Sequence, residues 1–379
     1  MKIDLSGRTA IVTGSTAGIG RATAEGLARA GASVIVNGHT QARVDQAVQQ
    51  MRAAFPESPI SGIAADLSTA EGANAFIAQA PDADILVNNV GTAFLREYFD
   101  VLQRRGLISE DEPGRVMGIE GAGVVTAIGT QVTDFAVGDR VGYLRSQGAY
   151  AGKRLIDADL LFPLPEDISF ETAAALTVKG FTAWLCAVRL CEVQPGQSVL
   201  VTTVAGGVGS LMARLVAHRG ARVIGAVGSE AKRAFAHESR AVDVAVGLDD
   251  AIEHVARLTD GRGVDVVFDG IGANTADRLL DAGTVRSGGT IISFGASGGW
   301  PRADPDAIAR RRATVVAPQV PNYMKTAAEL RAGMAEVFAL YLAGAFGKIS
   351  PARYPLREAA TLHTRVESCA ISGISVLVP

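Results

Sequence analysis

The sequence predicts an α/β protein in which two strand–helix–strand (βαβ) units, the first of them incomplete, flank a β-rich segment. In each unit a short β-rich run leads into a Gly-rich turn and a helical pattern, first in "TAIVTGSTAGIG" (9–20) and again in "SVLVTTVAGGVG" (198–209). A second strand then opens with Gly-Ala, at 31–36 and at 220–225. Both features repeat at the same offset of 189 residues, from Gly20 to Gly209 and from Gly31 to Gly220. Alternating strands and helices at this spacing imply parallel sheets with right-handed crossovers.

The remaining elements follow in order along the chain. Further strands are predicted in "ADILVNNVG" (83–91) and "VDVVFDGIG" (264–272). From 98 to 172, short β-rich runs broken by Gly, Asp and Thr predict a small β-barrel or open β-domain. A helix with Ser169 as its N-cap follows. After Arg312 we expect one strand, a long helix over 325–344 and a β-strand in the C-terminal "SGISVLVP".

Composition excludes several classes of protein. A net charge of −3 gives no electrostatic reason to expect binding to nucleic acid or to an anionic membrane. The three cysteines (Cys186, Cys191 and Cys369) include no C-x-x-C pair, so neither a disulfide framework nor a cysteine zinc lobe is expected. The N-terminus runs directly into a strand without a signal-peptide core, and we see no apolar run near the ~18 residues of a membrane span. We therefore expect a cytoplasmic protein.

A first phosphate-binding loop is predicted at Gly14, Gly18, Ile19 and Gly20. The glycines let the backbone turn tightly off a strand and approach a pyrophosphate. The helix that begins near Gly18 offers free N–H groups and its positive dipole end. The alternative is that these glycines serve packing only.

The surroundings of this loop resemble the short-chain dehydrogenase/reductase family over residues 1–97. The resemblance rests on the loop together with "AADLS" and "NNVG", and it implies that Asp66 holds the adenine amino group while Asn88 and Gly91 line the cofactor cleft. That family uses a Tyr-x-x-x-Lys pair, in which the Lys lowers the pKa of the Tyr. No Tyr in this chain has a Lys four positions later. We therefore expect a partial Rossmann-type unit that binds a dinucleotide without performing that family's chemistry.

Residues 98–379 resemble the medium-chain dehydrogenase/reductase family, specifically its quinone oxidoreductase (zeta-crystallin-like) branch. Seven motifs occur in one order: "YFDVLQRRGL", "GIEGAGVV", "FAVGDRV", "AAALTVKGFTAW", "AGGVG", "GRGVDVVFDGIG" and "GGTIISFGA". The resemblance implies a truncated GroES-like β domain at 98–172, a Rossmann cofactor domain at 173–312, and a return to the β-rich catalytic domain at 313–379. The two resemblances overlap within Thr92–Asp100, so we place the seam of a fusion there.

The second loop and its surroundings predict NADP (NADPH) as the cofactor. A NAD-specific unit usually has an acid about 20 residues beyond the last Gly of the loop. Here Ser229 occupies that position and the cations Lys232 and Arg233 follow, while the first unit ends its second strand at Asn37, again without an acid. For Lys232 the alternative is a solvated helix face, and Leu248 replaces a further Tyr partner of the family. The loop residues themselves are Ala205, Gly206, Gly207, Val208 and Gly209.

The same resemblance bears on the reaction class. Zinc-dependent members carry a His just before the Glu of a G-x-E segment, where this chain has Ile119 before Glu120. Without zinc ligands no metal is expected, and alcohol oxidation is disfavoured. Quinones and activated alkenes delocalise the charge that arrives with a hydride through their own carbonyl conjugation. The leading hypothesis is therefore NADPH-dependent reduction of a quinone or enone.

Other candidates come from family motifs. Lys179 and Thr182 match a segment beside the cofactor, and Gly272 and Phe294 lie in matching strand-end motifs. Asp100 matches an Asp of the family's pocket helix and is the one catalytic candidate. The departures Glu97 and Gln319, at positions where the family carries Asn and Arg, count against an intact pocket, and we expect His363 to be a surface residue.

Three alternatives to an active reductase stay open. The chain could be a cofactor-binding scaffold or redox sensor without catalysis, because the strands that normally begin the β-rich domain are absent. It could be a short-chain-type carbonyl reductase that lacks its Tyr and Lys, or a chain that folds poorly. The resemblance also suggests a homodimer through the cofactor domains.

Overall fold

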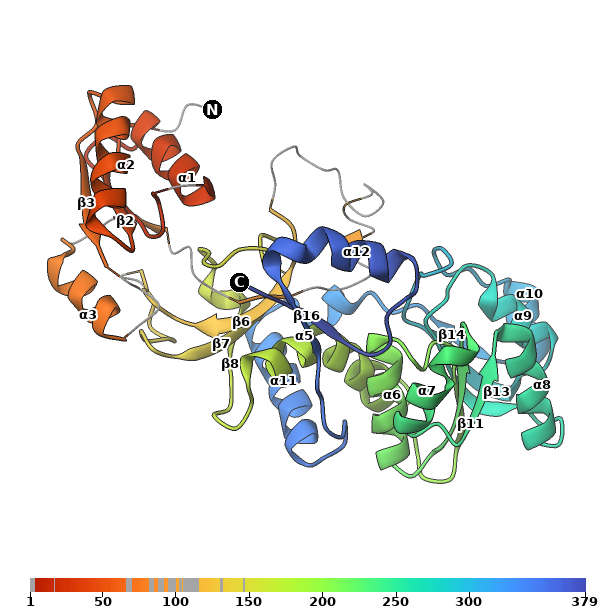
Figure 1. The fold of residues 1–379 in the computed structure, drawn as a ribbon. Coiled ribbons are helices and arrows are strands. Elements are labelled where there is room, and N and C mark those ends of the chain that lie inside the picture. The colour runs from red at the N-terminus through yellow and green to blue at the C-terminus, as the bar shows by residue number, and fades with distance from the viewer. Residues whose placement is uncertain are drawn as a thin grey trace.

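The N-terminal unit is a four-stranded parallel sheet in the order β3-β2-β1-β4. Figure 1 shows it in red and orange with helices α1, α2 and α3. The computed structural model describes residues 4–16, 18–65, 70–81, 85–87, 92–94, 100–101, 104, 116–129, 132–145 and 147–379. Helices α1 and α2 pack on one face of the sheet through the side chains of a small apolar core, and Phe76 of α3 packs on the other with Ile11 and Ile35. The elements are β1 (Thr9–Val12), α1 (Gly18–Arg29), β2 (Ser33–Gly38), α2 (Gln41–Ala54), β3 (Ile60–Ala64), α3 (Ala70–Gln79) and β4 (Ile85–Val87). The prediction of an incomplete first unit is confirmed.

The second unit is a six-stranded parallel sheet in the order β11-β10-β9-β12-β13-β14. Its central strands β9 and β12 are almost entirely buried, in keeping with their Val-rich sequences. The strand order reverses between β9 and β12, so the crevice where α/β proteins bind ligands lies at the carboxyl ends of these two strands. The elements are β9 (Ser198–Val201), α6 (Gly207–His218), β10 (Arg222–Val227), α7 (Arg233–Glu238), β11 (Asp243–Val246), α8 (Leu248–Leu258), β12 (Val264–Asp269), α9 (Thr275–Asp281), β13 (Val285–Ser293), α10 (Pro305–Arg311) and β14 (Thr314–Val316).

The β-rich segment forms a four-stranded antiparallel sheet in the order β5-β6-β7-β8. Its strands are β5 (Thr92–Phe94), β6 (Glu120–Val124), β7 (Arg140–Leu144) and β8 (Leu161–Pro163). Because Thr92 already pairs with Ala122, the chain leaves the first sheet between β4 and β5. This change of sheet precedes the boundary at residue 97 that the sequence predicted, and the position of the seam stays a prediction.

The C-terminal part returns to the β-rich sheet. The short parallel pair β15 (Ala352–Pro355) and β16 (Ser375–Val378) flanks α12 (Ala359–Glu367), and β16 contacts β5. The strand in "SGISVLVP" was predicted, whereas β15 and α12 were not. Short 3₁₀ turns complete the described chain at Ala158–Leu160, Glu230–Lys232, Val320–Tyr323 and Leu356–Glu358.

Helix α5 (Phe170–Trp184) is buried along nearly its whole length, between the β-rich sheet, α6 and α11. The Ser169 side chain accepts a hydrogen bond from Thr172 N, which confirms the predicted N-cap, and a π-helical turn extends the helix over Leu185–Leu190. Contrary to the expectation that no apolar run reaches such a length, Phe170–Leu190 is long and apolar enough to span a membrane. However, 83% of its most apolar window is buried inside the protein, as in the core helix of a globular domain.

Helix α11 (Ala327–Leu342) matches the long helix predicted near 325–344 and begins with a capping box between Thr326 and Glu329. It packs closely on α5 because a glycine stands at the contact. A Cβ added at Gly333 would lie 2.4 Å from Phe181 Cε2, inside van der Waals contact. The small residue therefore sets how near the two helices come.

Replacing Gly333 with Ala should destabilise the protein by about 1–3 kcal/mol, because Phe181 is fully buried and cannot move away freely. The midpoint of chemical unfolding, followed on the full chain, measures the change. Ala335→Ser, on the exposed side of the same helix, is the matched control and should shift stability by less than about 0.5 kcal/mol. Equal midpoints for both variants would contradict the close packing.

Candidate cofactor and active site

The loop between β9 and α6 has the shape of a phosphate cradle. Gly206 caps α6, and its N–H donates to Thr203 O at 2.9 Å, which closes the turn. A Cβ added at Gly209 would lie 2.0 Å from the same oxygen, so only glycine fits there. The first N–H groups of α6 have no partners within the helix and point their dipole end at the crevice. These residues fit a bound pyrophosphate.

The carboxylate of Asp269 holds together the three central strand ends beside this loop. Its Oδ1 accepts from Thr202 Oγ1 at 3.0 Å and from Ile271 N at 2.9 Å, while its Oδ2 accepts from Ser293 Oγ at 3.0 Å and Gly272 N at 3.1 Å. Thr202 follows β9, Asp269 ends β12 and Ser293 ends β13. One buried side chain therefore fixes the relative height of three strands at the switch point.

The charge on Asp269 is opposed by burial and favoured by its partners. Desolvation raises the pKa of this fully buried carboxyl above its ordinary value, and the four hydrogen bonds act in the opposite direction. Asp269 was not among the predicted site residues, although it lies in the quoted "VVFDGIG". An acid that ends a buried strand directly before a Gly-rich turn was the signal that could have identified it.

Two predicted cofactor residues, Gly272 and Phe294, lie at this same edge. Gly272 has φ +77, and a Cβ added there would lie 2.3 Å from Gly299 O. Phe294 N donates to the carbonyl oxygen of Asp269 at 2.9 Å, and a Cβ added at Gly270 would lie 3.1 Å from the tip of its ring. Both positions are therefore tied into the network around Asp269. Their cofactor contacts stay predictions.

The loop also meets β10 and the C-terminal segment. Val204 N donates to Ala226 O near the end of β10 at 3.1 Å, and Gly373 N donates to Ala205 O at 2.9 Å. The first bond places the residues that follow β10 next to the phosphate cradle. The second links the C-terminal segment before β16 to the same loop.

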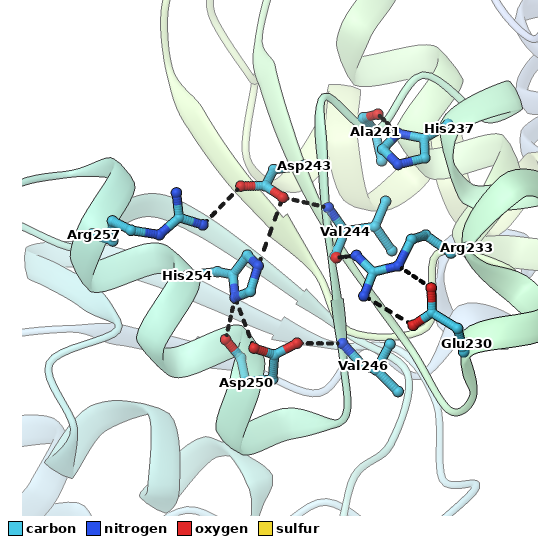
Figure 2. Close-up of polar contacts among 10 residues, drawn as sticks. All are labelled: Glu230, Arg233, His237, Ala241, Asp243, Val244, Val246, Asp250, His254 and Arg257. Carbon is cyan, nitrogen blue, oxygen red and sulfur yellow. Dashed lines mark hydrogen bonds and ion pairs between the residues drawn. The ribbon is translucent and has the colours of Figure 1, made fainter.

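Ser229 and Lys232 stand where the strand β10 ends, as predicted. Ser229 is exposed and Lys232 is half-buried, and Lys232 makes no ion pair within the described part of the chain. Arg233 is different, because its guanidinium binds Glu230 and the carbonyl oxygen of Val244 (Figure 2). Of the two cations that the sequence assigned to a 2′-phosphate, Arg233 is held by Glu230 and Val244, and only Lys232 forms no ion pair among the described residues.

Glu120 and Lys179 form a buried ion pair between the β-rich sheet and α5. Lys179 Nζ lies 3.6 Å from Glu120 Oε1, and Val178 N donates to Glu120 Oε2 at 2.8 Å. Both side chains are less than 5% exposed. Thr182, the other predicted residue of α5, donates its hydroxyl to Val178 O at 2.7 Å within its own helix. The structure thus gives both predicted α5 residues an internal contact, and their cofactor roles stay predictions.

Asp100, Tyr150 and His363 form a second buried polar cluster. The Tyr150 hydroxyl donates to Asp100 Oδ2 at 3.1 Å and lies 2.8 Å from His363 Nε2. The expectation that His363 is a surface residue was wrong, because its side chain is 2% exposed. Burial lowers the pKa of the His363 imidazole, the Arg104 guanidinium lowers it further, and burial raises the pKa of the Tyr150 phenol. The cluster connects three segments that are far apart in the sequence.

The first loop, between β1 and α1, has a similar glycine-lined turn, but a different side chain supports it. Gly14 has φ +59, and a Cβ added at Gly20 would lie 2.6 Å from Gly14 O. The Asn37 side chain accepts from Gly14 N at 3.1 Å and donates to Ile63 O at 3.0 Å, and it is 2% exposed. The Asn37 side chain thus links the loop to the end of β3 and holds it in place. Gly18 and Ile19 open α1 as expected, whereas Asp66, Asn88 and Gly91 lie outside the described residues.

The described residues contain no group of three or more His, Cys, Asp or Glu side chains placed to hold a metal ion. Ile119, at the position of a zinc-ligand His in zinc-dependent relatives, has no side-chain donor atom.

Comparison with known proteins matches the two parts of the chain to different families. The family model for short chain dehydrogenases matches residues 8–136, and that for zinc-binding dehydrogenases matches residues 207–336. Quinone oxidoreductase 1 of Escherichia coli is 33% identical over 289 residues, which cover 74% of this chain and 88% of that protein. The 2-haloacrylate reductase of a Burkholderia species is 34% identical over 300 residues, with 76% and 89% covered.

A solved structure supports the same relationship. The E. coli quinone oxidoreductase in complex with NADPH superposes with a TM-score of 0.72 at 32% identity, and the match covers 77% of this chain and 91% of that one. The two-part composition predicted from the sequence is therefore confirmed, and so is the α/β fold class.

The buried imidazole makes folding stability depend on pH. Because the folded state holds the pKa of His363 below its unfolded value of about 6.5, the unfolded chain takes up a proton first as the pH falls. Stability should therefore decrease from about pH 7.5 to about pH 5.5, and His363→Gln should reduce this decrease in the melting temperature. The exposed His218, changed to Gln, is the control and should leave the slope unaltered. Identical slopes for wild type and His363→Gln would contradict the burial of this ring.

Proposed function

Because this chain belongs to the quinone oxidoreductase family of medium-chain dehydrogenases and reductases, we propose that it reduces a quinone or an activated alkene with NADPH, without zinc, in the cytoplasm. The observation that carries the proposal is the set of residues gathered at the carboxyl ends of β9, β12 and β13. There the glycine cradle of α6 and the strand ends held by Asp269 meet at the switch point. The relatives support it, since one is a quinone oxidoreductase and another reduces a haloacrylate.

The residues of the second unit would hold the cofactor. The Thr203–Gly209 loop and the N-terminus of α6 would bind the pyrophosphate through backbone N–H groups. Lys232, whose ammonium forms no ion pair with any residue that the structure describes, would meet the 2′-phosphate. Gly272 leaves room for close approach at the end of β12, where a side chain would collide with the neighbouring backbone. When bound, NADPH supplies the hydride.

The rest of the chain positions the acceptor. The Gly373–Ala205 bond connects the β-rich part to the cofactor loop, and the Glu120–Lys179 ion pair connects it to α5. An acceptor beside the nicotinamide would be held between the two parts, and binding there would shield the reacting atoms from water. A conjugated carbonyl delocalises the incoming charge itself, so the donor-free Ile119 at the zinc-ligand position does not prevent the reaction. A homodimer through the cofactor domains remains our expectation for the assembly.

A second function, cofactor binding without catalysis, is favoured by one observation. The candidate catalytic carboxylate of Asp100 is fully buried and bonded to Tyr150, so it is used inside the β-rich part. A chain of this kind would bind NADPH and act as a scaffold or redox sensor.

NADPH consumption with 1,2-quinones, 1,4-quinones and an enone separates the two functions. The reductase predicts steady turnover with at least one acceptor class, unchanged after treatment with a zinc chelator. Tight NADPH binding without turnover of any acceptor would refute the reductase and support the scaffold. Turnover that disappears with the chelator and returns with zinc would refute the metal-free mechanism.

The two loops provide a matched pair of variants that locates the chemistry. Gly209→Ala should weaken NADPH binding about tenfold or more, since its Cβ collides with Thr203 O. Gly20→Ala creates the analogous collision with Gly14 O in the first loop, yet should leave NADPH-dependent turnover within about twofold of wild type. Dissociation constants and steady-state rates measure both. Loss of turnover in Gly20→Ala, with Gly209→Ala unaffected, would mean that the first unit binds the working cofactor and would contradict the proposal.

A further inference from the structure

The end of β10 carries both an acid and two cations, and the structure shows which of them are paired. The strand ends at Val227, and a Cβ added at Gly228 would meet no atom within 4 Å, so the space beyond it is open. The Val204–Ala226 hydrogen bond places this space beside the phosphate cradle. In this position an adenosine ribose meets the residues that follow the second strand. Those residues are Ser229, Glu230, Ala231, Lys232 and Arg233.

Glu230 is an acid of the kind that selects NAD. It lies 21 residues beyond Gly209, within the range where a carboxylate binds the ribose 2′-hydroxyl. Its side chain is 72% exposed, and the hydrogen bond from Arg233 lowers the pKa of its carboxyl, so it is charged at neutral pH. A free carboxylate here would bind a ribose hydroxyl and repel a 2′-phosphate. The prediction of NADP from the absence of an acid at Ser229 did not take Glu230 into account.

The guanidinium of Arg233 binds the carboxylate of Glu230. Its Nε donates to Glu230 Oε1 at 2.7 Å and its Nη2 to Glu230 Oε2 at 3.1 Å, which is a two-point contact (Figure 2). Its Nη1 donates to the carbonyl oxygen of Val244 on β11, and this third bond anchors the guanidinium to the sheet. Both oxygens of Glu230 are therefore engaged, and the anchor keeps Arg233 from turning away with its partner.

We propose that Arg233 sets the cofactor selectivity of this chain by masking Glu230, which leaves Lys232 as the charge that a 2′-phosphate meets. The inference rests on the proposed NADPH function and adds a determinant to it. In this arrangement Arg233 does not contact the phosphate. It acts through Glu230, so it is a positioning residue for selectivity.

The test compares two adenine nucleotides that differ at the 2′-position, so turnover is not needed. Calorimetry gives the dissociation constants of 2′,5′-ADP and 5′-AMP on the full chain, and their ratio measures preference for the 2′-phosphate. Arg233→Met should lower this preference about tenfold, because the released carboxylate repels the phosphate. Glu230→Gln alone should change it by less than about threefold, because wild-type Glu230 is already masked.

The double variant Arg233→Met/Glu230→Gln decides between two explanations. Masking predicts that it recovers the wild-type preference within about threefold. If Arg233 instead binds the 2′-phosphate directly, the double variant stays as poor as Arg233→Met, and the proposal is wrong. Arg257→Met is the matched control, since Arg257 pairs with Asp243 at 3.3 Å in the same region and does not contact Glu230 (Figure 2).

Other outcomes are also decisive. An unchanged preference in Arg233→Met overturns the proposal and leaves the proposed reductase intact. A wild-type chain that binds both nucleotides equally refutes NADPH selectivity, and with it the masking role. Absence of turnover with every acceptor would count against the reductase without altering these dissociation constants. Should Arg233→Met fold poorly through loss of its Val244 bond, Arg233→Lys keeps a charge but not the two-point contact, and should lower the preference partially.

Discussion

The buried carboxylate of Asp269 is the interaction on which the proposed site depends. It ends β12, and it binds a hydroxyl after β9, a hydroxyl at the end of β13 and two backbone N–H groups of its own turn. A carboxylate removed from water is costly unless hydrogen bonds replace its solvation. These four bonds do so, and they leave the strand ends little freedom to slide. The phosphate cradle, the Gly272 turn and Phe294 all take their positions from this edge of the sheet.

The chain combines this six-stranded cofactor unit with two smaller sheets. Within the described residues, the first sheet and the β-rich sheet have four strands each. The β-rich part is nevertheless joined to α5 through Glu120, to the phosphate loop through Gly373 and to α12 through Tyr150. These polar contacts come from buried groups that would be costly to leave without partners. They tie the β-rich part to its neighbours at three separate places.

Much of the fold could be predicted from local pattern, and the side-chain contacts could not. Gly209 and Gly272 could be identified from the sequence because each stands where the Cβ of any other residue would collide with the backbone, so that only glycine fits there. The burial of His363 depends on Tyr150, more than two hundred residues away, and α12 carries no strong apolar stripe. The masking of Glu230 depends likewise on Val244 from the neighbouring strand. The apolar helix Phe170–Leu190 shows the reverse case, since only the structure reveals that protein surrounds it.

A crystal structure of the full chain grown with NADPH tests the central claim most directly, namely that the second unit is the working cofactor site. The account predicts electron density for the pyrophosphate at the Thr203–Gly209 loop and for the 2′-phosphate beside Lys232, with Arg233 still bound to Glu230. Dinucleotide density at the Gly14–Gly20 loop alone, with the second loop empty, would contradict it.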